Sequence, residues 1–254
     1  MRQAANSRSS VVQAAIRNVQ ASRRRLSPVT DEIGSMIVSG ELKAGEVLSE
    51  RMFGDVRNVS RTSFREAIKV LEGKGLVRAR QNTGTQVAPR SDWHLLDPEI
   101  LAWRIGSGDI EQFIEDFFAF RRSIEPPAAE AAAGFQDRVR IAEMRRAYED
   151  MCALEASNPF GDEYVDADVR FHQAVFQASG NEFLMAMGYI LHVPLTLSFT
   201  LHSSLHVGPT NRLTLHQDVL AAIENGDPAA SRTASLALLS DVAHDVGRIV
   251  NTSD

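Results

Sequence analysis

The chain of 254 residues contains one cysteine, no lysine after Lys74 and no long apolar run. The single Cys152 excludes an intramolecular disulfide, and its place in a helical apolar pattern with Met144 and Tyr148 predicts a small core residue. No segment approaches the roughly 18 consecutive apolar residues of a membrane helix, and the N-terminal segment lacks the apolar centre of a secretory leader. These absences lead us to expect a cytoplasmic protein.

The acidic net charge of −6 is unevenly distributed along the chain. Residues 1–90 contain 16 Lys and Arg against 8 Asp and Glu, a net charge of +8. Residues 91–254 contain 11 against 25, a net charge of −14. Cation–phosphate contacts supply most nonspecific affinity for DNA, so this split predicts a nucleic-acid-binding module joined to one that does not touch phosphates. A chance asymmetry in a two-lobed enzyme is the alternative.

The chain divides into four parts by composition and pattern. Residues 1–25 carry six arginines and no acidic residue, which predicts a flexible basic tail that either adds phosphate contacts or has no role. Residues 26–89 show three short helical patterns and a hairpin, residues 90–98 form a linker between prolines, and residues 99–254 are helical with short breaks. The predicted fold is mainly α, a winged helix-turn-helix followed by an all-α antiparallel bundle.

The front part has the element order of a winged helix-turn-helix. A helix begins near Pro28, Ser49 caps a second helix and Ser60 caps a third, over residues 60–71. Two β-prone runs, residues 76–80 and 85–88, flank a polar tip that contains Gly84. In the third helix, Phe64, Ala67, Ile68 and Leu71 share one face, and cations recur every fourth residue at Arg61, Arg65 and Lys69. This pattern is typical of a DNA-recognition helix.

Each residue of the expected DNA-binding set has a stated role. Arg61 near the helix N-terminus is the candidate for a two-pronged contact to guanine, and the short side chains beside it reach bases or phosphates. Arg51 and Arg65 are expected to hold phosphates, and the wing-tip glycine allows close backbone approach. Any one arginine alone is more often a solvated surface charge. The full set is Arg51, Ser60, Arg61, Thr62, Ser63, Arg65 and Gly84.

The rear part places three polar residues on faces that should point into the bundle. Asp168 and His172 share a helical face with Val165 and Val175, and His216 shares another with Leu220 and Ile223. Such groups are costly in a core unless they are paired or coordinated, so they predict a polar pocket that suits Zn²⁺, Ni²⁺ or Mn²⁺. The alternative for each histidine is a core imidazole bonded to a backbone carbonyl.

Arg121 lies on another inward face, with Phe117 and Ile124. A buried guanidinium needs an anion, which is either Glu125 one turn later or the carboxylate of an effector such as a sugar acid. The expected effector-binding set is Arg121, Glu125, Gln173 and Asn181. The last two are weaker candidates, and Asn181 is equally suited to cap a helix.

The chain resembles the GntR family of bacterial regulators. The resemblance rests on Ser49-Glu50-Arg51, on Val59-Ser60-Arg61-Thr62 and on Gly75-Leu76-Val77 in the front part. The rear part, with Phe120-Arg121, Asp168-Val-Arg-Phe-His172, Gly180-Asn181 and His216, is similar to the FadR-type all-helical FCD effector domain. The stretch from Trp93 to Trp103 most resembles repressors that respond to galactonate.

Membership implies a homodimeric transcriptional regulator, not an enzyme, that binds a double-stranded palindromic operator and responds to a small carboxylate effector. Metal-binding members carry a further histidine where this chain has Leu238, and the galactonate-type members look similar in lacking it. Three protein ligands, with water or effector completing the site, remain possible, and His192, His202 or His206 could supply a fourth. Metal-dependent hydrolysis at Asp168, His172 and His216, and nonspecific DNA packaging, are the rival functions.

Overall fold

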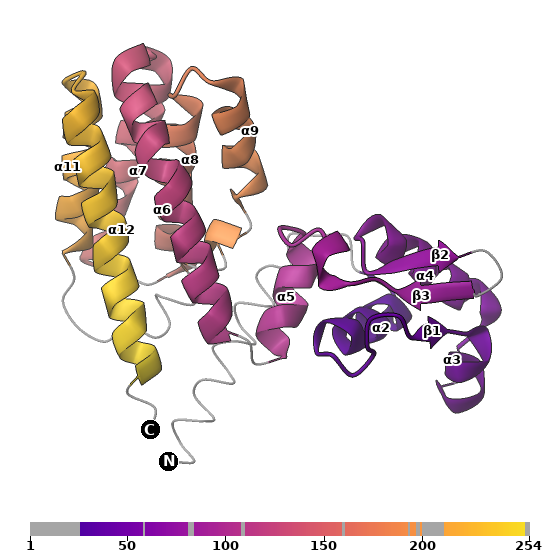
Figure 1. The fold of residues 1–254 in the computed structure, drawn as a ribbon. Coiled ribbons are helices and arrows are strands. Elements are labelled where there is room, and N and C mark those ends of the chain that lie inside the picture. The colour runs from indigo at the N-terminus through magenta and orange to yellow at the C-terminus, as the bar shows by residue number, and fades with distance from the viewer. Residues whose placement is uncertain are drawn as a thin grey trace. The chain divides into compact units, whose positions relative to one another are not determined.

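The computed structural model describes residues 26–57, 59–80, 84–107, 110–158, 161–192, 194–196, 199 and 211–251. The basic tail predicted for residues 1–25 lies outside the described residues. The rest divides between Ile110 and Glu111 into two compact units. We call them the winged-helix unit and the helical unit, and Figure 1 shows their elements.

Three helices of the winged-helix unit follow the sequence pattern closely. They are α2 (Pro28–Val38), α3 (Glu50–Arg57) and α4 (Arg61–Gly73). The Ser60 hydroxyl accepts a hydrogen bond from the Ser63 amide at 3.1 Å, which confirms Ser60 as the cap of α4. Phe64, Ala67 and Leu71 are buried in the core of this unit, as their helical spacing predicts.

A three-stranded antiparallel sheet completes the winged helix. Strands β2 (Val77–Arg80) and β3 (Gly84–Val87) form the predicted hairpin, with Arg80 opposite Gly84. The third strand, β1 (Val47–Leu48), pairs with the other edge of β3. The sequence pattern predicted only a connector there, because two residues carry no alternation and the pairing partner lies almost 40 residues away.

The segment after the wing packs on the winged helix. It contains a 3₁₀ turn, η1 (Arg90–Asp92), and the helix α5 (Pro98–Gly106). Ile100 and Trp103 of α5 belong to the same buried core as Phe64 and Leu71. The helix that begins at Pro98, which the pattern assigned to the rear part, therefore lies in the winged-helix unit.

The described part of the helical unit contains six helices: α6 (Ile110–Phe135), α7 (Arg138–Glu155), α8 (Asp162–Gln177), α9 (Glu182–Ile190), α11 (Arg212–Glu224) and α12 (Pro228–Asn251). Helix α7 packs on α8 and α11, α8 also packs on α9, and α11 packs on α12 (Figure 1). None of the helices in the described part of the chain combines the length and apolar character that a membrane crossing needs.

The prediction for Cys152 is wrong, because this residue is exposed. The buried face of α7 contains Met144 and Met151 instead. One residue corresponds to about 100° around a helix, so Cys152 lies beside the core face and not on it.

Candidate functional site

The recognition helix presents its cations to solvent. The side chains of Arg61 and Arg65 are 89% and 75% exposed. Both approach Glu50 at the start of α3: Arg65 Nε donates to Glu50 Oε1 at 2.9 Å, and Arg61 Nε lies 3.6 Å from Glu50 Oε2. One carboxylate therefore faces both arginines, and exposed ion pairs of this kind are weak enough to exchange for phosphate or base contacts.

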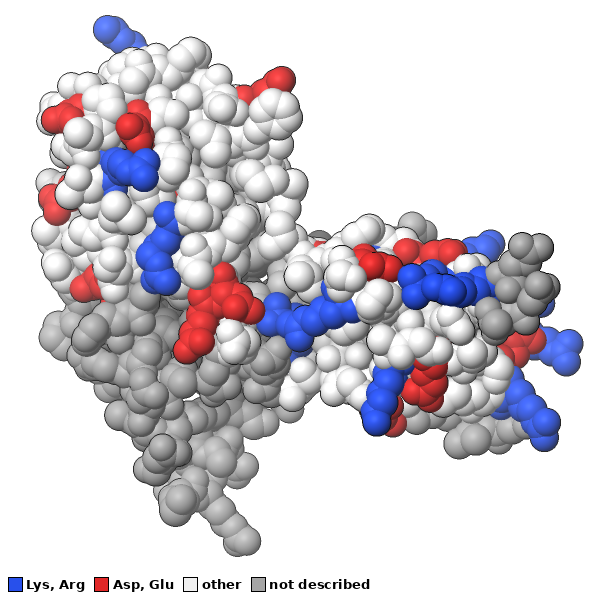
Figure 2. All heavy atoms as spheres, in the orientation of Figure 1, with Lys and Arg blue, Asp and Glu red and all other residues white. Residues whose placement is uncertain are grey.

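The other predicted DNA-facing residues lie on α3, at the start of α4 and at the start of β3. Arg51 and Thr62 are exposed, and Ser63 is half-buried, with its hydroxyl 2.9 Å from that of Ser60. Gly84 begins β3 with a φ of 84°, a left-handed conformation that favours glycine. In Figure 2, Lys and Arg side chains project from the winged-helix unit, with acidic side chains between them.

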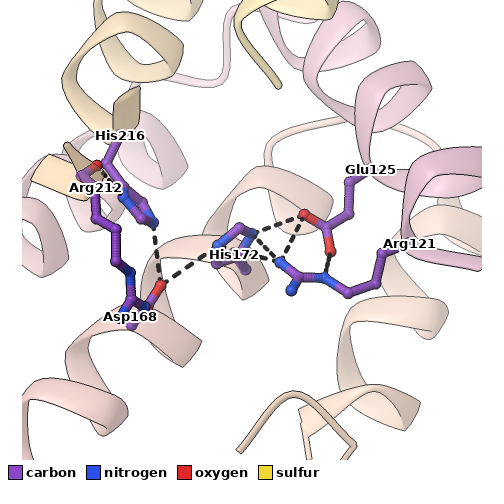
Figure 3. Close-up of polar contacts among 6 residues, drawn as sticks. All are labelled: Arg121, Glu125, Asp168, His172, Arg212 and His216. Atoms are coloured by element: carbon purple, nitrogen blue, oxygen red, sulfur yellow. Dashed lines mark hydrogen bonds and ion pairs between the residues drawn. The ribbon is translucent and has the colours of Figure 1, made fainter. Parts of the chain in front are cut away.

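The second site is a buried cluster of charged residues inside the helical unit (Figure 3). Helices α6, α8 and α11 contribute two residues each, and in every pair the two residues lie four positions apart on one helical face. All six are at least 96% buried: Arg121, Glu125, Asp168, His172, Arg212 and His216. Two guanidinium groups face two carboxylates, so the cluster is close to neutral before the histidines are counted.

Asp168 lies at the centre of one half of the cluster. Its Oδ2 accepts a hydrogen bond from Arg212 Nη2 in a buried ion pair. Its Oδ1 lies 3.1 Å from His216 Nε2 and 3.4 Å from His172 Nε2. The sequence reasoning missed Arg212, although its position four residues before His216 places it on the same helical face.

Both histidines are oriented by their other ring nitrogen. His216 Nδ1 lies 2.7 Å from the backbone oxygen of Arg212, and His172 Nδ1 lies 2.8 Å from Glu125 Oε2. If each Nδ1 donates a proton to its oxygen, each Nε2 is turned toward Asp168 Oδ1. Carboxylates and carbonyls orient metal-ligating histidines in the same way. The ligand atoms of Asp168, His172 and His216 lie within 4.8 Å of one another, so these three residues fit a divalent metal ion.

Arg121 forms the other half of the cluster with Glu125. Its Nε donates to Glu125 Oε1 at 2.5 Å, and its guanidinium lies over the rings of Phe118 and Phe199 at 5.2 and 4.9 Å. The structural pairing predicted as one alternative is therefore present. One nitrogen of this guanidinium remains unpaired: Arg121 Nη1 is buried and has no hydrogen-bond partner among the described residues.

Two family descriptions match the chain over most of its length. "Bacterial regulatory proteins, gntR family" matches residues 27–87, and "FCD domain" matches residues 116–241. The chain is 32% identical over 221 residues to the uncharacterized HTH-type transcriptional regulator YieP of Escherichia coli K12, covering 86% of this chain and 94% of that protein. The chain belongs to the gntR family.

Two further proteins are similar to this chain over most of its length. The galactonate operon transcriptional repressor of Escherichia coli K12 is 26% identical over 213 residues, covering 82% of this chain and 90% of the repressor. A solved structure of Lar, which controls expression of the Listeria monocytogenes agr system, has a TM-score of 0.52 at 16% identity, covering 89% and 99% of the two chains. The latter likeness concerns the fold alone.

This gntR-family protein is a ligand-responsive transcriptional regulator that binds DNA, as its sequence predicts. The matching family and the curated relatives are transcriptional regulators and not enzymes, so the hydrolase alternative is not supported.

Three other candidate ligand residues of the regulator, Gln173, Asn181 and His192, form hydrogen bonds with partners outside the buried cluster. Asn181 caps α9, where its Oδ1 accepts from the amides of Phe183 and Leu184, and it is exposed. The Gln173 amide group donates to the Gly188 carbonyl. Leu238, which stands where metal-binding members carry a histidine, is buried. His192 is exposed and 3.1 Å from Gln173, whereas His202 and His206 lie outside the described residues.

In the buried cluster of the gntR-family regulator, neighbouring charges lower the pKa of both carboxylates by more than burial raises it. Burial alone raises the pKa of Asp168, but the charges of Arg212 and His216 hold it well below the ordinary value. Burial likewise opposes ionisation of Glu125, yet Arg121 and His172 lower its pKa to about 2. Burial lowers the pKa of His216, whereas Glu125 and Asp168 overcome burial at His172 and raise its pKa.

The lowered pKa of Glu125 predicts acid sensitivity of the metal-free regulator. Its contribution to stability is complete above the ordinary pKa of 4.5 and is lost as the pH falls toward 2. At 1.36 kcal/mol per pKa unit, the loss is about 3 kcal/mol. Urea unfolding in EDTA, repeated from pH 7 to pH 3, should show the difference between wild type and Glu125→Gln shrinking below pH 4.5.

Glu130→Gln is the matched control for this titration, because Glu130 lies on the same helix in an exposed pair with Arg232. We expect its effect on the unfolding free energy to stay below about 1 kcal/mol at every pH. A pH-independent difference between wild type and Glu125→Gln would contradict the assignment of the lowered pKa.

Proposed function

We propose that this regulator is a cytoplasmic repressor that binds a palindromic operator as a homodimer and leaves it when a small carboxylate, such as a sugar acid, binds in the buried cluster. The observation that carries the ligand proposal is the unpartnered Nη1 of Arg121, a buried cationic donor. Donors of this kind favour a carboxylate, which accepts charge-assisted hydrogen bonds from a guanidinium. The likeness to a galactonate operon repressor supports a hydroxylated acid.

The dimer proposal rests on the affinity that DNA binding requires. Each chain carries one recognition helix, and two half-sites on a palindrome give an affinity that one helix rarely reaches. The contacts of Arg51, Arg61, Thr62, Ser63, Arg65 and Gly84 with DNA are part of the same proposal. Ser60 contributes by capping α4, which fixes the helix start at Arg61.

A divalent metal ion is proposed for the same cluster, held by Asp168 Oδ1 and the Nε2 atoms of His172 and His216. The support is the orientation of both histidines through Nδ1, together with the engagement of Asp168 Oδ2 by Arg212. Three protein ligands leave positions open for water or an effector oxygen. A bound Zn²⁺, Ni²⁺ or Mn²⁺ would make the nearly neutral cluster positive, which again favours an anionic effector.

Ligand-induced release tests this proposal. An operator is first selected from random DNA with the wild-type protein, and its release is then followed by fluorescence anisotropy with galactonate, gluconate and octanoate as probes. We expect release by a hexonate at lower concentration than by octanoate. Arg121→Lys keeps the charge opposite Glu125 but lacks the forked donor, so it should raise the half-maximal hexonate concentration about 10- to 100-fold.

Arg122→Lys is the matched control, because Arg122 is the next residue of α6 and is exposed. It should respond to the hexonate as wild type does. Equal response curves for Arg121→Lys and wild type would remove Arg121 from the effector site. An operator that no hexonate releases would exclude the sugar-acid effector.

A further inference from the structure

The recognition helix is tied at its C-terminal end to helix α5. Lys74, the C-cap of α4 and the last lysine of the chain, donates through Nζ to Asp97 Oδ2 and to Glu99 Oε2, both at 2.8 Å. The side chain of Lys74 is only 11% exposed, and those of both acids are 20% exposed. The backbone joins the same contact, since the His94 amide donates to the Lys74 carbonyl at 3.0 Å.

The Asp97 carboxylate accepts hydrogen bonds from both α5 and the C-cap of α4. Its Oδ1 accepts from the amides of Glu99 and Ile100 at 3.0 and 3.3 Å, which is the hydrogen-bond pattern of an N-cap for α5. The same carboxylate receives Lys74 from the end of α4. A single side chain therefore joins the C-cap of one helix to the first turn of the other, in a partly buried place where ion pairs are less screened than on the surface.

The other end of α5 is fixed to α2. Trp103 Nε1 donates to Asp31 Oδ1 at 2.7 Å, and the indole ring lies against Gly34. A Cβ atom at Gly34 would lie 2.2 Å from Trp103 Cη2, so only glycine lets the ring approach this closely. Helix α5 is thus held between the helix that reads DNA and the helix that supports it.

We propose that Lys74 is a positioning residue for DNA reading: it clamps α4 to α5, so that the direction of Arg61 and Arg65 follows the position of α5. Lys74 touches no DNA in this arrangement, because its ammonium is occupied by two carboxylates. Helix α5 ends four residues before Ile110, the last residue of the winged-helix unit. The clamp therefore makes α5 the place where a displacement of the chain after Gly106 reaches the recognition helix. The clamp acts whatever the effector is.

Operator affinity and its salt dependence test the clamp. With the selected operator as probe, Lys74→Gln should weaken binding about 3- to 30-fold, the usual range for a coupling contact. The slope of log affinity against log salt concentration should not change, because no phosphate contact is lost. A lysine that held a phosphate would lower that slope by about 0.9. Lys43→Gln, which removes an exposed cation of the winged-helix unit outside α4, is the matched control for charge removal and should bind within about twofold of wild type.

The double variant Asp97→Asn/Glu99→Gln separates positioning from direct contact. It keeps the Lys74 cation but removes the clamp, so it should lose affinity as Lys74→Gln does, and hydrogen exchange of the α5 amides should become faster. Lys74→Arg retains the ion pair and should bind within about twofold of wild type. Unchanged affinity of the double variant, or a lowered salt slope for Lys74→Gln, would overturn the proposal. If Lys74→Gln does not fold, the double variant and Lys74→Arg decide alone.

Discussion

Asp168→Ala is expected to lower the free energy of unfolding by about 3–5 kcal/mol and to abolish metal binding. The stability loss follows because Arg212 keeps its charge in a buried place after its partner is removed, and an uncompensated buried charge is strongly destabilising. The metal loss follows because Asp168 is the only carboxylate of the proposed ligand set. Urea unfolding measures the first effect, and elemental analysis with Zn²⁺ calorimetry measures the second.

Asp166→Ala is a matched control on the same helix. Asp166 is exposed and pairs with Arg170, so its removal should cost less than about 1 kcal/mol and leave the metal content unchanged. The double variant Asp168→Ala/Arg212→Leu removes the uncompensated charge and should regain stability without regaining metal. Wild-type protein that contains no stoichiometric metal and shows no thermal shift with Zn²⁺, Ni²⁺ or Mn²⁺ would exclude the metal while leaving the stability argument intact.

Arg61→Ala is expected to weaken specific operator binding by about 1–3 kcal/mol and to relax the base preference at one position of each half-site. The reason is that Arg61 begins α4, the end of a recognition helix that reaches base edges, and its side chain is the more exposed of the two arginines that face Glu50. Anisotropy titrations with the selected operator and with operators changed at single positions measure both effects.

Arg232→Ala, in an exposed pair of the helical unit, is the control for removal of an arginine. It should leave operator affinity unchanged. If Arg61→Ala lost affinity equally for every DNA sequence, Arg61 would be a phosphate contact and not a base reader.

The winged helix could be predicted because its signals are local. The cap at Ser60, the apolar spacing of Phe64, Ala67 and Leu71, and the glycine at the wing tip each act within a few residues. The inward position of Asp168, His172 and His216 followed in the same way from helical periodicity. The family matches confirm the kind of protein that these patterns indicated.

Other features were missed because they depend on residues far apart in the chain. Strand β1 exists through its pairing with β3, and Arg212 becomes important because the fold brings α11 to Asp168 on α8. Asn181 could be read as a ligand residue or a cap, and only its contacts with the amides of α9 distinguish the two.

The sequence by itself determined that this protein joins a basic DNA-reading unit to an acidic helical one, since charge and periodicity are properties of the chain. The tertiary structure alone decided which charges meet. It pairs Asp168 with Arg212, turns two imidazoles toward one carboxylate oxygen and clamps Lys74 to the start of α5. Burial makes these pairings decisive, because a charge removed from water must find its partner within a few ångströms, wherever in the sequence that partner lies.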